Sequence, residues 1–459
     1  MTDAAFVLAS SAATWLVLVA TILLVSLRSG AASAGLVSAY AVSLWLIHWP
    51  GGAIYLLPWF PGVDEQVVAA GFQQSAYAIV AFGVGSLVLG PLLMTVVPTT
   101  RATARGGAAT AYSRAYLGLG LACYVAMGAV VGRVPTLTAL VSTGWNLLIV
   151  GLGLSCWQAW HRGRNVQLLG WLAAAACLPF LTILGQGYLT YGSAAALAVL
   201  TLVASFYRPR WRILLAALLV VYAAFSLYVT YMRDRETIRG VVWSDQPAMA
   251  RVGQLVATLS TLEGFDPTND QHLALLDDRL NQNRLDGAAV EYLDSGLADF
   301  ARGDTLGQAA AALVPRVLWP DKPVAAGSPG IVSQYTGIHF DPNTSVGIGH
   351  VMEFYINFGT SGVVLGFVVL GLVLSVVDRA AADRLRARDW AGFTVWFLPG
   401  FNLLQVGGSL VELTASVGAA LLTALLVNAV LGHLLAHDVS TRAARVVPPR
   451  LRPVGVPRG

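Results

Sequence analysis

Runs of about 20 apolar residues recur along this chain, and they constrain its fold more than any other feature. Hydrophobic residues make up 56% of the 459 positions, whereas charged residues make up only 11%. A soluble protein of this length cannot bury so large an apolar fraction, and a membrane β-barrel would alternate polar and apolar residues instead. The pattern therefore predicts an all-α, polytopic membrane protein whose spanning unit is a helical bundle.

We expect about 11 transmembrane helices, counting the N-terminal run as a retained span because no basic region precedes it. The expected spans are 6–27, 34–49, 73–96, 115–132, 143–160, 168–184, 189–206, 213–231, 355–377, 391–409 and 413–434. This divides the chain into an N-terminal membrane bundle of eight spans (1–231), one large loop (232–350), three C-terminal spans (351–434) and a basic tail (435–459).

Arginine is distributed unequally between the two sides of the expected bundle. Every second connection is basic, as is the tail, and together they hold Arg28, Arg101, Arg105, Arg114, Arg162, Arg164, Arg208, Arg210, Arg212, Arg379, Arg384, Arg386, Arg388, Arg442, Arg445, Arg450, Arg452 and Arg458. The short connections on the other side hold only Arg133. Because basic loops stay in the cytoplasm, we expect a cytoplasmic (inner) membrane protein whose large loop faces the periplasm or the extracellular space. Orientation and anionic headgroups explain the basic residues, so no nucleic-acid partner is expected.

The large loop is far longer than an ordinary connection, which is typical of a functional segment. It has an acidic balance, with 9 basic and 15 acidic residues between positions 232 and 350. Apolar residues recur at helical spacing over 251–265, 272–285 and 287–302. We therefore expect short amphipathic helices that lie on the outer face of the bundle.

Two basic clusters in this loop are candidate phosphate sites, because the planar guanidinium group of arginine binds pairs of oxygen atoms. The first cluster, Arg233, Arg235 and Arg239, opens the loop at the membrane surface. The alternative interpretation of this cluster is a solvated turn. The second combines Arg316 with Lys322, the only lysine, around Trp319, whose ring suits a sugar face. An interfacial anchor is the alternative for this second cluster, since Trp and Lys flank many spans.

Glu353 lies about one helical turn before the apolar run of the ninth span, with His350 three residues earlier on the same helix face. A carboxylate partly shielded by the membrane is a candidate general base. The alternative is a helix-N-terminal acid favoured by the macrodipole. Asn357 follows one turn later, and Asp64, Glu65 and Glu412 are weaker carboxylate candidates. No nucleotide-binding loop and no Cys/His metal spacing is found, so neither a cofactor nor a metal is expected.

Residues 314–362 resemble the oligosaccharide repeat-unit polymerases, the Wzy-type O-antigen and exopolysaccharide polymerases. The resemblance lies in Pro-Arg-x-x-Trp-Pro-x-Lys-Pro over Pro315–Pro323 and in Glu-x-Tyr-x-Asn-Phe-Gly-x-x-Gly over Glu353–Gly362. It covers about 50 residues, and the remainder matches in architecture alone.

The resemblance implies a membrane glycosyltransferase that polymerises oligosaccharide repeat units carried on undecaprenyl diphosphate, with release of that lipid diphosphate. It implies the lipid bilayer, a chain-length regulator and a flippase as partners. Under it, Glu353 and Arg316 are catalytic, and Lys322, Arg233, Arg235, Arg239, Trp319, His350 and Asn357 bind the substrate or its diphosphate.

Three other functions share parts of this pattern. An O-antigen ligase has the same architecture and lipid donor, and another lipid-linked-sugar glycosyltransferase would depend on Asp64 and Glu65 instead. A polysaccharide transporter or flippase would need polar groups deep in the bundle, near broken helices. The candidate charges cluster at the outer surface instead, which favours the polymerase.

Overall fold

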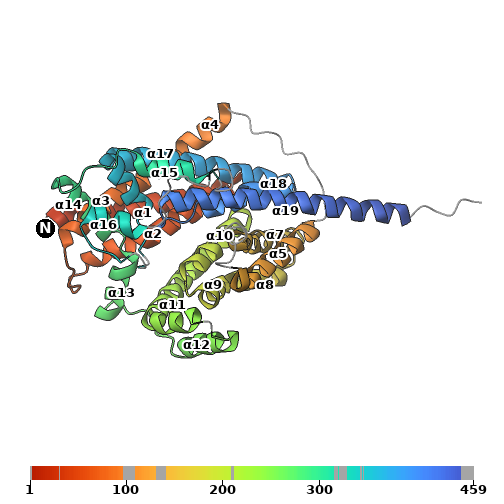
Figure 1. Ribbon diagram of the computed structural model, residues 1–459, viewed down its shortest axis with the longest axis horizontal. Coiled ribbons are helices and arrows are strands. Elements are labelled where there is room, and N and C mark those ends of the chain that lie inside the picture. Colours follow the sequence, from red (N-terminus) through yellow and green to blue (C-terminus); the bar gives the residue numbers. More distant parts are fainter. Residues whose placement is uncertain are drawn as a thin grey trace, which may run out of the picture.

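The computed structural model describes residues 3–29, 32–96, 109–130, 141–207, 211–244, 246–314, 319, 328–341, 344 and 346–445. Every element over these residues is a helix, which confirms the all-α prediction for the described part of the chain. Figure 1 shows an elongated bundle in which α19 runs along the long axis, and the N-terminus lies at the end opposite to the one from which α19 emerges.

Helices of the N-terminal half build most of the bundle. They are α1 (Asp3–Ser29), α2 (Leu36–Ala53), the 3-10 turn η2 (Ile54–Leu56), α3 (Glu65–Gly83), the π-helical stretch η3 (Val84–Leu89), α4 (Gly90–Val96), α5 (Ala109–Val130), α7 (Leu147–His161), α8 (Asn165–Ala176), α9 (Leu178–Gln186), α10 (Thr190–Tyr207) and α11 (Trp211–Trp243). The N-terminus of α2 is fixed from α17 (His350–Arg386), where the Asp378 carboxylate accepts hydrogen bonds from the backbone N–H groups of Ala34 and Leu36 at 3.1 and 2.7 Å. These bonds satisfy donors that a helix start leaves without partners.

The large loop contains helices over each of the stretches where amphipathic spacing was found. These are α12 (Ala248–Ser260), α13 (Asp270–Leu280) and α14 (Asn283–Asp294), followed by α15 (Asp304–Ala312) and α16 (Ser328–Thr336). The chain then continues through α17, α18 (Trp390–Asn402) and α19 (Leu410–Arg445). Figure 1 shows α14 and α16 at the end of the bundle that holds the N-terminus.

Six helical stretches among the described residues are long and apolar enough to cross a membrane, so the expected count of about 11 is not supported. They are Asp3–Ser29, Glu65–Val96, Asn165–Gln186, Thr190–Tyr207, His350–Arg386 and Leu410–Leu434. Two of the expected spans are not counted because their helices are too short. The helix α7 replaces the expected span 143–160 and has 15 residues, and α18 replaces the expected span 391–409 and has 13 residues. At 1.5 Å per residue they reach about 20 Å, whereas a bilayer core is about 30 Å thick. Sequence hydropathy detects apolar content but not where a helix ends.

Candidate functional site

The most polar part of the buried interior lies where α14 crosses α3. The two helices meet through Gly71 and Gly287, and a Cβ atom at either glycine would overlap a backbone carbonyl oxygen of the other helix. This close approach carries α14 into the bundle instead of onto its outer face, which corrects the expectation of surface helices for this element. Consequently the side chains of Asn283 and Asp286 are fully buried, with exposures of 0% and 1%.

Asn283 connects α14 to the first three helices. Its side-chain N–H groups donate to the backbone oxygen of His48 at 2.7 Å and to Asn281 Oδ1 at 2.8 Å, which fixes the amide orientation. Asn283 Oδ1 therefore faces His48 Nδ1 at 2.9 Å as an acceptor, so the proton of His48 is on Nδ1. The hydroxyl of Ser75 also donates to Asn283 Oδ1 and accepts from Trp15 Nε1. One amide thus joins α1, α2 and α3 to the loop.

Asp286 lies beside this network but takes no hydrogen bond from it. Its Oδ2 is 3.5 Å from His48 Nδ1, longer than the 2.9 Å bond that the same nitrogen makes to Asn283. Neither carboxylate oxygen has a hydrogen-bond partner. Burial is the main influence and raises the pKa of Asp286 well above its usual range, while the Met352 backbone acts in the opposite direction. An unpartnered buried carboxyl costs folding free energy, and such groups are found disproportionately at functional sites.

The first two turns of α17 carry three of the residues selected from the sequence, and all three are buried. His350 is fully enclosed, with Nδ1 2.9 Å from the hydroxyl of Tyr40 in α2 and with Nε2 lacking a partner. Glu353 is 0% exposed, so it is enclosed rather than half-shielded as expected. Its Oε2 accepts the backbone N–H of Leu410 at 2.6 Å, at the first residue of α19, whereas Oε1 has no partner. The carboxylate therefore lies at the positive end of the α19 dipole.

Asn357 closes a break in α17. Phe358 and Gly359 depart from helical geometry, and Gly359 has φ +62° and ψ −152°, a conformation that only glycine adopts readily. Asn357 Oδ1 accepts the N–H of Gly303 at 2.9 Å, and its Nδ2 donates to the hydroxyl of Thr305 at 2.7 Å. Asn357 therefore holds the segment that leads into α15 against the broken turn, and this fixes the loop directly over Glu353.

The three arginines of α11 are engaged within their own part of the chain. Arg233 pairs with Asp234 and with Glu263 at 2.9 and 3.2 Å, and Arg235 pairs with Glu236 at 3.0 Å. Arg239 is buried, with its guanidinium 4.8 and 5.1 Å from the ring centres of Tyr188 and Trp243. α11 contacts α9, α12 and α13, and Figure 1 shows it apart from α17. The structure therefore does not bring this cluster to Glu353.

Arg316 and Lys322 lie outside the described residues, and Trp319 is 43% exposed. Asp64 and Glu412 are exposed carboxylates at the starts of α3 and α19. Glu412 forms a capping box with Ser409, because Glu412 Oε2 accepts the Ser409 N–H and the Ser409 hydroxyl accepts the Glu412 N–H. The capping box gives Glu412 a structural role.

A family of domains of unknown function, DUF8712, matches residues 63–436. The chain belongs to this family. The match begins before α3 and ends within α19, so it includes α14 and both halves of the broken α17. No curated protein and no solved structure matches the chain.

The buried residues of this network that sequence reasoning missed are Asp286 and Asn283, and the network joins them to His48 of α2. The only sequence signal at α14 is the run of small residues Gly287, Ala288 and Ala289 beside Asp286, which allows a close helix approach. Among the described residues, no group of three or more His, Cys, Asp or Glu side chains is arranged to hold a metal ion.

Proposed function

We propose that this protein polymerises undecaprenyl-diphosphate-linked oligosaccharide repeat units at the outer face of the cytoplasmic membrane. One observation supports the assignment of the site above all others. Within the Glu353–Gly362 motif, Glu353 has Oε2 held by the N-terminus of α19, while Oε1 has no hydrogen-bond partner of normal geometry and the Thr305 hydroxyl lies beside the carboxyl. A fixed carboxylate with one unoccupied oxygen has the geometry of a general base.

The proposed reaction assigns Glu353 to the acceptor sugar. Glu353 Oε1 takes the proton of the acceptor hydroxyl as that oxygen bonds to the anomeric carbon of the donor. The bond between this carbon and the diphosphate breaks, and undecaprenyl diphosphate leaves with the electron pair. Arg316 and Lys322 are assigned to the departing diphosphate, since cationic donors stabilise such a leaving group. The pairing of Arg233 and Arg235 with acidic neighbours favours a structural role for those two residues.

In this structure the segment before α15 and the start of α19 cover Glu353. The proposed reaction therefore requires that residues 301–305 separate from the broken turn of α17 before the acceptor reaches Oε1. The orientation belongs to the same proposal: the end of the bundle with α14 and α16 faces outward, and the arginine-rich end faces the cytoplasm.

The test is the glycan size profile of a strain whose own copy is replaced by Glu353→Gln. Glutamine keeps an acceptor for the Leu410 N–H but cannot take a proton, so chain extension should fall by about a hundred-fold or more. Glu412→Gln is the matched control, because it changes an exposed carboxylate at the same helix start. A single-repeat species should persist in the Glu353→Gln strain at normal protein abundance. Full-length polymer in that strain would refute the assignment.

Transport across the membrane is the second candidate, and two observations favour it. A broken apolar helix and ionisable groups enclosed in the bundle are the features that a transporter or flippase requires. The chain has the first at Phe358–Gly359 and the second at His48 and Asp286. The same strains separate the functions, because loss of every capped species, including the single repeat, indicates a flippase or a ligase.

A further inference from the structure

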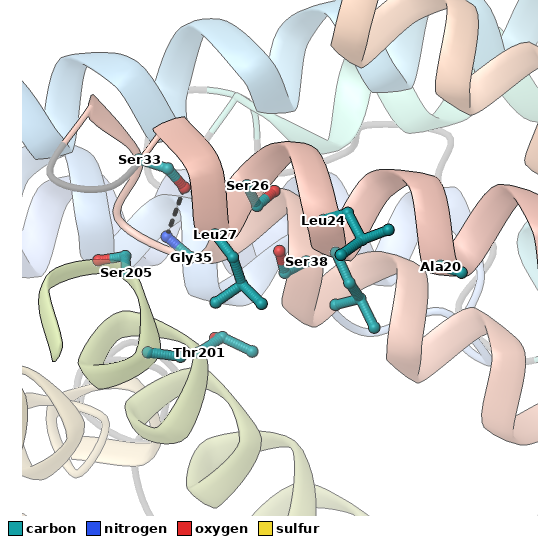
Figure 2. A pocket seen from close by; sticks show the side chains of 11 residues that line it. Ala20, Leu24, Ser26, Leu27, Ser33, Gly35, Ser38, Thr201 and Ser205 are labelled. Carbon is teal, nitrogen blue, oxygen red and sulfur yellow. Dashed lines mark hydrogen bonds between the residues drawn. The ribbon is translucent and has the colours of Figure 1, made fainter. Parts of the chain in front are cut away.

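A cleft of about 400 Å³ lies far from the polar cluster, between α1, α2 and α10. Figure 2 shows lining residues from all three helices: Leu24 and Leu27 of α1, Ser38 of α2, and Thr201 and Ser205 of α10. The lining surface is almost entirely apolar, although several lining residues carry hydroxyl groups.

Three of the lining hydroxyl groups are hydrogen-bonded within the protein, which reduces the polarity of the cleft. Thr201 Oγ1 donates to the backbone oxygen of Leu197 at 3.0 Å, and Ser205 Oγ donates to that of Leu202 at 2.7 Å. Ser33 Oγ accepts the Gly35 N–H at 3.0 Å, the bond drawn in Figure 2. The side chains therefore present mainly carbon to the cavity, which suits an aliphatic ligand.

One end of the cleft is closed by a close contact between α2 and α10. Gly35 has φ +86°, and a Cβ atom there would lie 2.6 Å from the backbone nitrogen of Leu202. The α1 side is open, because Ala20 and Leu24 line the cleft and are also exposed, Leu24 by 50%. The exposed apolar surface continues along α1 through Leu16 and Val17. Since α1 is long and apolar enough to cross a membrane, this surface faces acyl chains.

The charge at this end of the bundle identifies the ligand class further. Arg28 is exposed in the last turn of α1, one turn beyond Leu24. At the end of α17, Arg384 and Arg386 pair with Asp389 and Asp383, so the positive charge that favours an anionic ligand is that of Arg28. A guanidinium at a membrane surface attracts anionic headgroups. We propose that one acyl chain of an anionic membrane phospholipid occupies this cleft, with its phosphate beside Arg28. This binding is independent of glycosyl transfer.

The experiment reconstitutes the full-length protein in nanodiscs that contain a phosphatidylglycerol with a diazirine in its acyl chain, and maps the photolabelled peptides by mass spectrometry. Label should concentrate on residues 20–27 and 201–205, above the level on the remaining exposed faces of α1 and α10. Phosphatidylcholine with the same diazirine chain should label these residues less. Cleft residues that stay unlabelled by both lipids while the exposed face of α1 is labelled would mean that protein fills the cleft, and the proposal would be wrong.

Three variants sharpen the result. Ala20→Phe with Ala204→Phe fills the cleft from two sides and should reduce its label to the level on the rest of α1, whereas Ala13→Phe, on an exposed position of the same helix, should not. Arg28→Gln should lower the preference for phosphatidylglycerol about five-fold, the equivalent of about 1 kcal/mol for one basic residue at a membrane surface. Equal labelling by both lipids in the wild type, or a preference unchanged by Arg28→Gln, would overturn the assignment of an anionic lipid. If the filled variant does not fold, the wild-type map and Arg28→Gln still decide the question.

Discussion

Gly287→Ala should destabilise the protein, although a glycine-to-alanine substitution in an exposed helix normally stabilises that helix. In a helix interior, alanine is favoured over glycine by about 1 kcal/mol. At position 287, however, the new Cβ atom would overlap the carbonyl oxygen of Val67, a backbone atom of α3 that no rotamer change can displace. Overpacking of this kind costs about 3 kcal/mol at the upper end of its usual range.

The consequence extends to the polar cluster. If α14 moves outward to relieve the overlap, Asn283 loses its bonds to His48, and each such bond contributes about 1 kcal/mol. The overlap less the helix gain leaves about 2 kcal/mol, and one or two lost bonds bring the expected loss of stability to about 3 to 4 kcal/mol.

The assay is thermal unfolding of the purified protein in detergent, together with limited proteolysis of the loop. Gly253→Ala is the matched control, because Gly253 lies in α12 of the same loop and a Cβ atom there meets nothing within 4 Å. Gly253→Ala should raise the midpoint temperature of unfolding slightly. Gly287→Ala should lower this temperature and make the large loop more susceptible to protease. An unchanged or raised midpoint for Gly287→Ala would show that α14 does not depend on this contact.

Three further predictions concern the backbone, the buried acid and the topology. Gly359→Ala places a side chain at φ +62° and should cost about 1 to 3 kcal/mol in thermal unfolding, whereas Gly240→Ala, in open space on α11, should not destabilise. Because burial raises the folded-state pKa of Asp286, the protonated side chain contributes fully to stability below about pH 3.9, and this contribution is lost as the pH rises towards the folded-state pKa. Asp286→Asn should remove this pH dependence from the midpoints of thermal unfolding. In a background without native cysteines, Asp278→Cys should react with an impermeant thiol reagent in spheroplasts and Asn165→Cys should not; the reverse result would invert the orientation.

Sequence patterns predicted the helical class and the helices of the large loop, because both depend on local periodicity and composition. They did not predict that Glu353 is fully buried, since partial shielding was expected there. They did not predict that α14 enters the bundle. Asp286 lies in a stretch with the charge content of a solvated helix, and only the contact between Gly71 and Gly287, far apart in sequence, makes it buried. The overestimate of spans has a related cause, since hydropathy does not show that α7 begins only at Leu147 or that α18 ends at Asn402.

Under the proposed function, the acceptor must reach Glu353 past the contacts around the broken helix. The break leaves the Ile356 carbonyl without its helical partner, and the N–H of Ala301 bonds to it at 2.8 Å, while the N–H of Gly303 bonds to Asn357. Separation also breaks the bond from Asn357 to the buried Thr305 hydroxyl, and each of the three bonds costs about 1 kcal/mol. Water can replace the bonds of Ala301 and Gly303, because Arg302 and Asp304 beside them are exposed. Undocking α14 would cost more, since it would break the bonds of Asn283 to His48 and expose the buried apolar side chains of Ala289 and Leu293, which outweighs the hydration of the Asp286 carboxyl. Access to Glu353 should therefore open through local separation of residues 301–305, while α14 stays packed against α3 and keeps its hydrogen bonds to α2 and α3.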